Sequence, residues 1–233
     1  MPVENPLAVG NRGAVTGTYN APAMRAGLEA LKQGGTAADA VVTTALAQVA
    51  LASGSWVSYT GIFTMVYYDA GTNNIYCLNA GYNTVKGEDD PTSIPVANVA
   101  ARLGGDTYGG KPSGRTVLVP GFMAGVEAAH RRFGKLPWDS LVGPAIYYAE
   151  KGFVISPYFA SFIDSRKDVL TRLPATRRVY TKQDGSLYGA GDLFKQTELA
   201  ATLRRVAEGG AQYMYTGDWA QKLVKAVRSE AGR

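Results

Sequence analysis

The sequence of 233 residues predicts a globular protein of the α+β class. Three observations support this prediction: an amphipathic helix runs directly into an apolar one, an antiparallel hairpin follows, and helix patterns fill most of the remaining chain. Hydrophobic residues make up 46% of the sequence, which is enough for a substantial core. No repeat and no convincing linker divides the chain, so we expect residues 1–233 to have no internal domain boundary.

The first predicted helix is amphipathic and begins near Asn20. Asn20 is of a type that caps helices, Pro22 suits an opening turn, and apolar residues recur at helical spacing in MRAGLEALK. Gly34 and Gly35 follow, and glycine can supply the left-handed backbone that ends a helix. We therefore expect one face of this helix against the core and the other in solvent.

The second predicted helix lies in an uncharged stretch from Ala40 through Tyr68. Thr36 can cap its start, and Asp39, at the third helical position, complements the positive end of the helix dipole. The helical part is apolar on every side, which is typical of a helix packed under a sheet. A membrane span is the alternative, but the apolar run is about half of the ~20 residues that a span needs. We therefore expect a core helix and no membrane segment.

Two strands are predicted next, in FTMVYYD and NIYCLNA, around the turn residues Ala70 to Asn73. The segment RTVLVPG, Arg115 to Gly121, has the pattern of a further strand. Helix patterns then cover four segments: Phe122 to Phe133, Leu136 to Lys151, Gln196 to Glu208, and a last one from Gly217. The stretch from Ser156 to Leu193 is interpreted as helix-poor, because it holds Pro157, Pro174 and several glycines.

Charge and composition exclude several classes of protein. The net charge of +5 comes from basic residues scattered through predicted helices, which indicates solvated helix faces and no nucleic-acid partner. The single cysteine, Cys77, excludes an internal disulfide and a multi-cysteine metal site, and the single histidine, His130, removes most zinc arrangements. The N-terminal residues lack a signal-peptide pattern, so we expect a cytoplasmic protein, or a periplasmic or secreted one if a leader has been removed.

No local motif supplies a catalytic group. Residues Gly105 to Lys111 fit the start of a phosphate-binding loop, but Pro112 stands where serine or threonine is needed, so a surface loop is the better interpretation. His130 lies among arginines on a predicted helix, which favours an exposed or boundary histidine. Cys77 lies inside a predicted strand, where a buried and inert thiol is expected.

Four segments follow one another in an order that is shared with a known family. They are AGLEALKQGGTAADAVVTTALA, FTMVYYDAGTNNIYCLN, VLVPGFMAGVEAAHRRFGKLPWDSLVGPAIYYAEKGFVIS and GDLFKQTELAATLRRVAEGGAQYMYTGDWAQKLVKAV. Together they resemble the gamma-glutamyltranspeptidases over about Gly13 to Val227. The GG-T-AADA and VPG segments are the most specific parts of this resemblance.

The resemblance implies an N-terminal nucleophile hydrolase, a four-layer αββα sandwich made as a proenzyme that cuts itself into a large and a small subunit. This chain resembles the large-subunit portion. In the family the nucleophile is the N-terminal threonine of the small subunit, whose α-amino group can act as its base, and the oxyanion donors also come from that subunit. The resemblance therefore implies acyl transfer from a small amide, no catalytic residue in this chain, no metal or organic cofactor, and a threonine-initiated small (beta) subunit as partner. It also allows a dimer of such heterodimers.

Two departures from the family pattern bear on the substrate. In the family's LDFRETAP, the arginine grips the α-carboxylate of a γ-glutamyl group, and here Gly81 falls in its place. The family's GIGGGGF is replaced by SWVSYTGIF, whose large side chains would reshape the cavity that the glycines line. Arg115 or Arg102 could restore a positive charge from elsewhere. We expect substrate contacts from side chains that flank the lost arginine or replace the glycines, namely Asn79, Tyr82, Trp56 and Tyr59, although the last two are also of types that anchor cores and loops.

Three hypotheses about function follow. The leading one is an amidase or acylase acting on a small amide with a non-standard acyl group, such as an oxamate-like acid or a side chain like those removed by cephalosporin acylases. The alternatives are a true γ-glutamyl hydrolase or transferase in which another cation holds the carboxylate, and a non-catalytic homologue that serves as a binding or scaffold protein. The family's large subunits continue beyond the helix at Trp219 to Val227. We therefore expect either that the gene product is cut or disordered there or that residues 1–233 are a piece of a longer polypeptide, and in both cases we expect these residues to be unstable alone.

Overall fold

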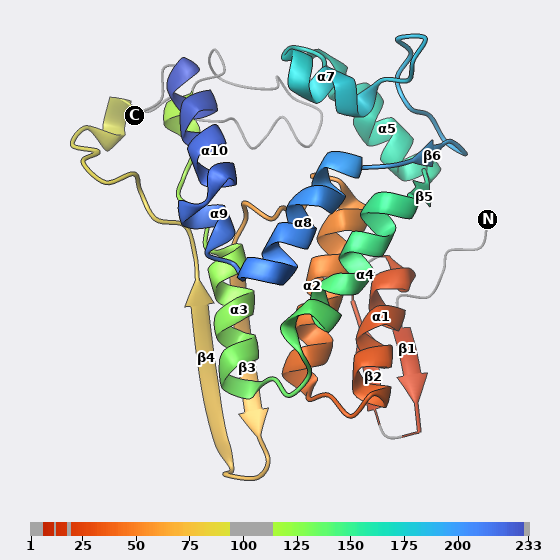
Figure 1. Ribbon diagram of the computed structural model, residues 1–233, viewed down its shortest axis with the longest axis vertical. Coiled ribbons are helices and arrows are strands. Elements are labelled where there is room, and N and C mark those ends of the chain that lie inside the picture. Colours follow the sequence, from red (N-terminus) through yellow and green to blue (C-terminus); the bar gives the residue numbers. More distant parts are fainter. Residues whose placement is uncertain (1–6, 12, 18–19, 94–113, 231–233) are drawn as a thin grey trace. The chain divides into compact units, whose positions relative to one another are not determined.

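The computed structural model describes residues 7–11, 13–17, 20–93 and 114–230 (Figure 1). Within these ranges it contains both helices and antiparallel strand pairs, which confirms the predicted α+β class. Arg102 and the loop-like segment from Gly105 to Lys111 lie outside the described residues.

The chain divides into two compact units. The first, residues 1–58 and 129–208, contains α1 (Ala21–Lys32), α2 (Ala37–Ala52) and α4 (Trp138–Lys151), and α2 contacts both other helices. It also holds β1 (Leu7–Gly10) paired with β2 (Gly13–Thr16), β5 (Phe153–Val154) paired with β6 (Leu193–Phe194), α5 (Pro157–Ser165), α6 (Lys167–Leu170), α7 (Pro174–Tyr180) and α8 (Thr197–Gly209). The prediction that the chain has no internal domain boundary stays a prediction.

The second unit, residues 59–128 and 209–233, is built on an antiparallel hairpin. β3 (Phe63–Asp69) pairs with β4 (Asn74–Ala80) along its whole length, which confirms the predicted hairpin. Asp69 closes the turn, because its Oδ1 accepts a hydrogen bond from the Gly71 N–H at 3.0 Å. The unit's other elements are η1 (Pro91–Ser93), η3 (Gly114–Thr116), the start of α3 (Phe122–Phe133), α9 (Tyr213–Thr216) and α10 (Asp218–Ser229).

Helix α2 is buried on nearly every side, as its uncharged sequence predicts. Val42, Leu46 and Ala47 have no exposed surface. Met24 and Leu28 of α1 pack in the same hydrophobic cluster as Ala47. Burial of these apolar side chains is the main force that holds the first unit together.

Asp39 closes the start of α2. Its carboxylate accepts a hydrogen bond from the Thr36 N–H at 2.8 Å, and the Thr36 hydroxyl accepts one from the Asp39 N–H at 3.2 Å, so the predicted cap is confirmed as a capping box. The same carboxylate accepts from the backbone N–H groups of Lys135 and Leu136, at 2.9 and 3.4 Å. Asp39 is fully buried, and a buried charge needs such donors because it has lost its hydration.

Two side chains hold the other end of α2. The Tyr180 hydroxyl donates to the carbonyl of Ser53 at 2.7 Å, and the Gln196 side-chain amide donates to the carbonyl of Ala50 at 2.8 Å. The last carbonyls of a helix lack intrahelical backbone donors, and these two bonds supply donors from outside the helix; the Ala50 carbonyl also accepts from the Ser53 hydroxyl at 3.2 Å. Burial raises the pKa of the Tyr180 hydroxyl, because the charged phenolate would lose its hydration.

Two predicted segments were wrong. Arg115 to Gly121 does not form a strand, because its first residues turn into η3 and only Val119 makes a bridge, to Asn83. Ser156 to Leu193 is not helix-poor, since it contains α5, α6 and α7. Its prolines open helices instead of breaking them: Pro157 and Pro174 stand in the first turns of α5 and α7, where a missing N–H costs nothing.

Two predicted side-chain roles were also wrong. Cys77 is exposed, because it lies opposite Val66 on the outer face of the hairpin, and Val66 is itself 73% exposed. Asn20 stands before α1, but its side chain makes no capping hydrogen bond. Its backbone is left-handed, with φ 64°, whereas a capping residue normally has extended backbone. Gly34 does supply the predicted left-handed backbone after α1, at φ 84°.

His130 is a boundary residue, as expected: its Nε2 hydrogen-bonds to the Leu136 carbonyl at 2.8 Å, and its ring packs against Trp138. Among the described residues there is no group of three or more His, Cys, Asp and Glu side chains that could hold a metal ion. Within the same residues no helix is long and apolar enough to cross a membrane.

Candidate substrate-binding site

The backbone that follows β4 is held by partners within the second unit. Asn83 exchanges two backbone hydrogen bonds with Val119, with N to O distances of 3.0 and 2.9 Å. The N–H of Gly121 donates to the carbonyl of Gly61 at 3.1 Å. The segment around Gly81, where the family pattern has arginine, therefore lies between paired stretches of backbone.

Gly121, in the VPG segment, lies so close to the backbone at Ala80 and Gly81 that there is no room for a side chain. A β-carbon at this position would lie 2.3 Å from the carbonyl oxygen of Ala80 and 2.5 Å from that of Gly81. Because these are backbone atoms, a side chain would push the start of α3 away from the hairpin beside it (Figure 1). On the other side, the Tyr215 hydroxyl donates to the carbonyl of Pro120 at 2.9 Å. Burial raises the pKa of this hydroxyl, which keeps it a donor.

Gly81 has one close side-chain neighbour among the described residues. Within 4 Å, a β-carbon here would meet one atom of the described residues, the Oδ1 of Asn79, at 3.3 Å. The backbone of Gly81 is not in the left-handed region, so other residues can adopt its conformation. A β-carbon at this position would therefore require Asn79 to move by a few tenths of an ångström. The glycine is a chemical difference from the family pattern.

The four predicted contact residues lie in different surroundings. Asn79 and Tyr82 flank the glycine and are exposed, Tyr82 to 50%. Tyr59 is only 8% exposed, and its ring packs edge-on against Phe122 with centroids 6.0 Å apart. These three belong to the second unit, whereas Trp56 belongs to the first. Asn79 and Tyr82 are therefore both exposed in the sequence around Gly81, and Tyr59 is a packing residue of the same unit.

Trp56 is part of an exposed aromatic cluster that the sequence analysis missed. Its indole N–H donates to the hydroxyl of Tyr158, and its ring lies 6.2 Å from that of Phe162. The Arg166 guanidinium lies over the same Phe162 ring, 5.1 Å from its centroid. Trp56 and Tyr158 are 49% and 62% exposed. Tyr158 and Phe162 are four residues apart on α5, and this spacing is a signal that could have revealed the helix.

Arg115 is engaged inside the second unit. Its guanidinium pairs with the Glu88 carboxylate at 3.0 Å and donates to the Ser93 hydroxyl at 2.8 Å. The two paired side chains are 20% and 5% exposed, so the pair is shielded from water. The charge of Arg115 is therefore largely balanced by Glu88, and we do not assign it the role of the lost arginine.

The fold is that of gamma-glutamyltranspeptidases. The structure superposes on the enzyme from Helicobacter pylori with a TM-score of 0.81 at 26% identity, covering 97% of this chain and 63% of that chain. Residues 23–233 match the family model described as Gamma-glutamyltranspeptidase, and the chain belongs to this family.

Two further relatives show the range of the similarity. A glutathione hydrolase proenzyme of Arthroderma benhamiae is 30% identical over 229 residues, which are 96% of this chain and 38% of that protein. The structure of a cephalosporin acylase from Bacillus halodurans matches with a TM-score of 0.69 at 25% identity, over 90% of this chain and 38% of that chain. The chain spans about a third of the length of such curated relatives: 34 to 38% for those that match more than nine-tenths of this chain.

Proposed function

We propose that this chain is the large-subunit part of a self-processing amide hydrolase or acyltransferase. Its substrate is a small amide whose acyl group is not a standard γ-glutamyl group. Membership of the gamma-glutamyltranspeptidase family supports the amide chemistry. The observation that carries the substrate is Gly81, which stands in place of the arginine that grips a γ-glutamyl carboxylate.

The surroundings of Gly81 support this substrate. Without a bidentate guanidinium, the α-carboxylate of a γ-glutamyl substrate would lose a strong charge-assisted contact. A substrate with this carboxylate would therefore bind more weakly. Arg115 is already paired with Glu88, which argues against the true γ-glutamyl enzyme with a replacement cation from that position. Asn79 and Tyr82 would instead offer hydrogen bonds to an uncharged or singly charged acyl group.

The proposed reaction uses the N-terminal threonine of a small subunit. Its hydroxyl oxygen attacks the carbonyl carbon of the amide, and its proton passes through the threonine α-amino group to the leaving nitrogen as the C–N bond breaks. Water or an amine then attacks the resulting ester, releases the acyl group and returns a proton to the threonine oxygen. In this scheme Asn79 and Tyr82 orient the acyl group. The proenzyme named among the relatives supports such a partner.

The first test is the intact mass and N-terminal sequence of every polypeptide in the purified protein. A second chain that begins with threonine is the expected result. A single unprocessed chain without activity on any amide would overturn the proposal and favour a binding or scaffold protein.

The second test is an activity comparison with Gly81→Arg. We expect the wild-type protein to hydrolyse simple amides and to be poor on a γ-glutamyl anilide. Installing the arginine should raise kcat/KM for the anilide by about tenfold or more, since a charge-assisted pair contributes about 1.5–3 kcal/mol. Gly81→Gln is the control, because it adds length without charge. High wild-type activity on the anilide would instead support the γ-glutamyl enzyme with another cation.

A further inference from the structure

The segment that follows Tyr82 is fastened to the stretch of chain before α3. Immediately after Tyr82, the backbone of Asn83 exchanges two hydrogen bonds with that of Val119, at N to O distances of 3.0 and 2.9 Å. Further along, a side chain makes the connection, because Arg115 of η3 reaches back to residues 88–93. Both connections lie within the second unit.

The guanidinium of Arg115 bonds to three points along residues 88–93. It donates to the Glu88 carboxylate at 3.0 Å, to the Ser93 hydroxyl at 2.8 Å and to the carbonyl of Asp90 at 3.2 Å. A guanidinium presents five N–H donors in a rigid plane, so one side chain can hold several acceptors in a fixed relation. Arg115 therefore fixes the path of this segment as well as balancing a charge.

The turn that carries Arg115 is itself bonded to another element. The N–H of Gly114 donates to the carbonyl of Glu230, directly after α10, at 2.6 Å. The carbonyl of Gly114 accepts from the N–H of Val117 at 3.1 Å, which closes the turn of η3. The guanidinium therefore extends from a closed turn that is joined to the end of a helix.

The ion pair between Arg115 and Glu88 is shielded from water, since the two side chains are 20% and 5% exposed. A buried pair adds little net stability, because both charges lose their hydration. Removing one partner is costly, however, since the other charge then stays buried without a counter-charge. We therefore expect this pair to select one arrangement of the segment more than to raise the overall stability.

The fastened segment begins at the candidate site. Tyr82, which is 50% exposed, directly precedes Asn83 and its bridge to the stretch before α3. On the other side of Tyr82, the carbonyls of Ala80 and Gly81 lie against Gly121, where a β-carbon would be 2.3 and 2.5 Å away from them. The backbone of Tyr82 is thus held from both directions, and a displacement of the fastened segment would move its side chain.

We infer that Arg115 is a positioning residue of the candidate substrate-binding site: it fastens residues 83–93 and so sets where Tyr82 meets the acyl group. Arg115 acts through Tyr82 and makes no substrate contact of its own. The contact between Tyr82 and the acyl group rests on the proposed function, whereas the fastening rests only on bonds within the second unit.

Hydrogen exchange of the purified full protein tests the fastening. In Arg115→Gln the buried Glu88 carboxylate loses its partner, so peptides that cover residues 82–93 should exchange faster than in the wild type, by about tenfold or more. Peptides from residues 63–80, in the β3–β4 hairpin, should keep their wild-type rates. Unchanged exchange in residues 82–93, or an equal rise in the hairpin, would overturn the proposal.

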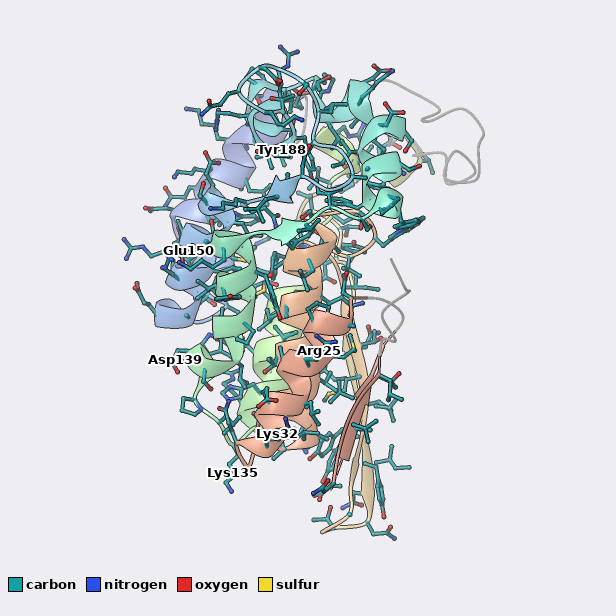
Figure 2. All side chains as sticks on the ribbon, turned by 90° about the vertical axis from the view of Figure 1, so that its right-hand side faces the viewer. Arg25, Lys32, Lys135, Asp139, Glu150 and Tyr188 are labelled. Atoms are coloured by element: carbon teal, nitrogen blue, oxygen red, sulfur yellow. The ribbon has the colours of Figure 1, made fainter. Side chains whose placement is uncertain are left out.

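Arg204→Gln is the matched control. Arg204 also pairs with a glutamate, Glu150 on α4 of the first unit (Figure 2), but these two side chains are 46% and 43% exposed. Because exposed pairs contribute little, this variant should leave exchange in residues 82–93 unchanged. If it accelerates exchange there as much as Arg115→Gln does, the effect comes from the loss of any arginine and the proposal is wrong.

Steady-state kinetics test the positioning, on the amide that the wild type hydrolyses best. Displacement of a side chain that binds the acyl group should raise KM, by about tenfold in Arg115→Gln, and leave kcat within about twofold. A purely structural role would instead reduce the amount of folded enzyme, which lowers kcat at constant KM. That second pattern, or unchanged kinetics with faster exchange, would overturn the proposal. A wild type that hydrolyses no amide would refute the proposed function, and the exchange comparison would still decide whether Arg115 fastens the segment.

Glu88→Gln covers the case in which Arg115→Gln does not fold. The amide oxygen of glutamine can still accept from the guanidinium, but without the charge assistance, and the bonds from Arg115 to Ser93 and to the Asp90 carbonyl remain. Exchange in residues 82–93 should therefore rise by less, about threefold, and KM should rise with it. Wild-type exchange in this variant would contradict the role of the pair.

Discussion

Helix α2 and the β3–β4 hairpin differ in how much of their surface the described residues bury. Both ends of α2 are bonded to distant parts of the first unit. At its start the helix's own Asp39 carboxylate accepts from the backbone N–H of Lys135, and at its end the Tyr180 hydroxyl donates to the Ser53 carbonyl. The hairpin buries only its inner face, with Phe63 and Met65 at most 9% exposed. On its outer face Val66, Tyr68 and Ile75 are 57 to 73% exposed.

This difference between α2 and the hairpin shows which groups the described residues pair or cover and which they leave in solvent. The Asp39 carboxylate and the carbonyls of Ala50 and Ser53, at the ends of α2, find partners within the same unit. The outer face of the hairpin places apolar side chains of facing residue pairs in solvent, which is unusual for a stable surface. If the proposed small subunit exists, this face is the part of the second unit that a partner would stabilise most.

The largest effect should come from Asp39→Ala. It removes a buried acceptor and leaves the N–H groups of Thr36, Lys135 and Leu136 without their bonds to it, so we expect a loss of about 3–4 kcal/mol in the free energy of unfolding. Urea denaturation followed by tryptophan fluorescence measures it. Asp139→Ala, on the exposed first turn of α4, is the control and should cost less than about 1 kcal/mol. Equal losses in the two variants would contradict the role of Asp39.

A second prediction compares a valine-to-threonine substitution in α2 with the same substitution on the outer face of the hairpin. Val42→Thr puts a hydroxyl into the fully buried face of α2 and should cost about 1–2 kcal/mol, whereas Val66→Thr on the exposed strand face should change stability by less than about 0.5 kcal/mol. The free energies come from the same denaturation experiment. If Val66→Thr costs as much as Val42→Thr, the outer face of the hairpin is covered in the purified protein.

The smallest effect should come from Tyr180→Phe, which removes the hydroxyl that caps the Ser53 carbonyl and should cost about 1 kcal/mol at neutral pH. The folded protein holds the pKa of Tyr180 above its unfolded value of about 10. The stabilisation is therefore fully present below pH 10 and is lost as the pH rises through the folded pKa. The free energy of unfolding of the wild type should fall more steeply above pH 10 than that of the variant. Parallel pH curves would contradict this assignment.

Features that depend on neighbouring residues could be predicted from the sequence. The cap of α2 at Thr36, the antiparallel hairpin with its turn at Asp69, and the left-handed backbone of Gly34 after α1 all follow from short-range signals. The bonds from Asp39 to Lys135 and Leu136 could not be predicted, because no local pattern reports a contact over 96 or 97 residues. The burial of Cys77 was misjudged for a related reason, since strand alternation does not say which face is covered.

The candidate site could be predicted only in part. The sequence places Asn79 and Tyr82 beside Gly81, and in the structure a β-carbon at Gly81 would lie 3.3 Å from the Oδ1 of Asn79. The aromatic partners of Trp56 were missed, because Pro157 was interpreted as a helix breaker when it opens α5. Proline has both roles, and only its position within the first turn separates them.

The long reach of the Asp39 contacts also bears on the order in which the first unit folds. The hairpin strands are joined by a short turn, whereas Asp39 must meet a loop 96 residues away. Closing a long loop loses more chain entropy, so local pairs form early and this contact forms late. Interactions that are absent from the folding transition state mainly slow unfolding. We therefore expect loss of the Asp39 bonds to Lys135 and Leu136 to speed unfolding of the unit more than it slows folding.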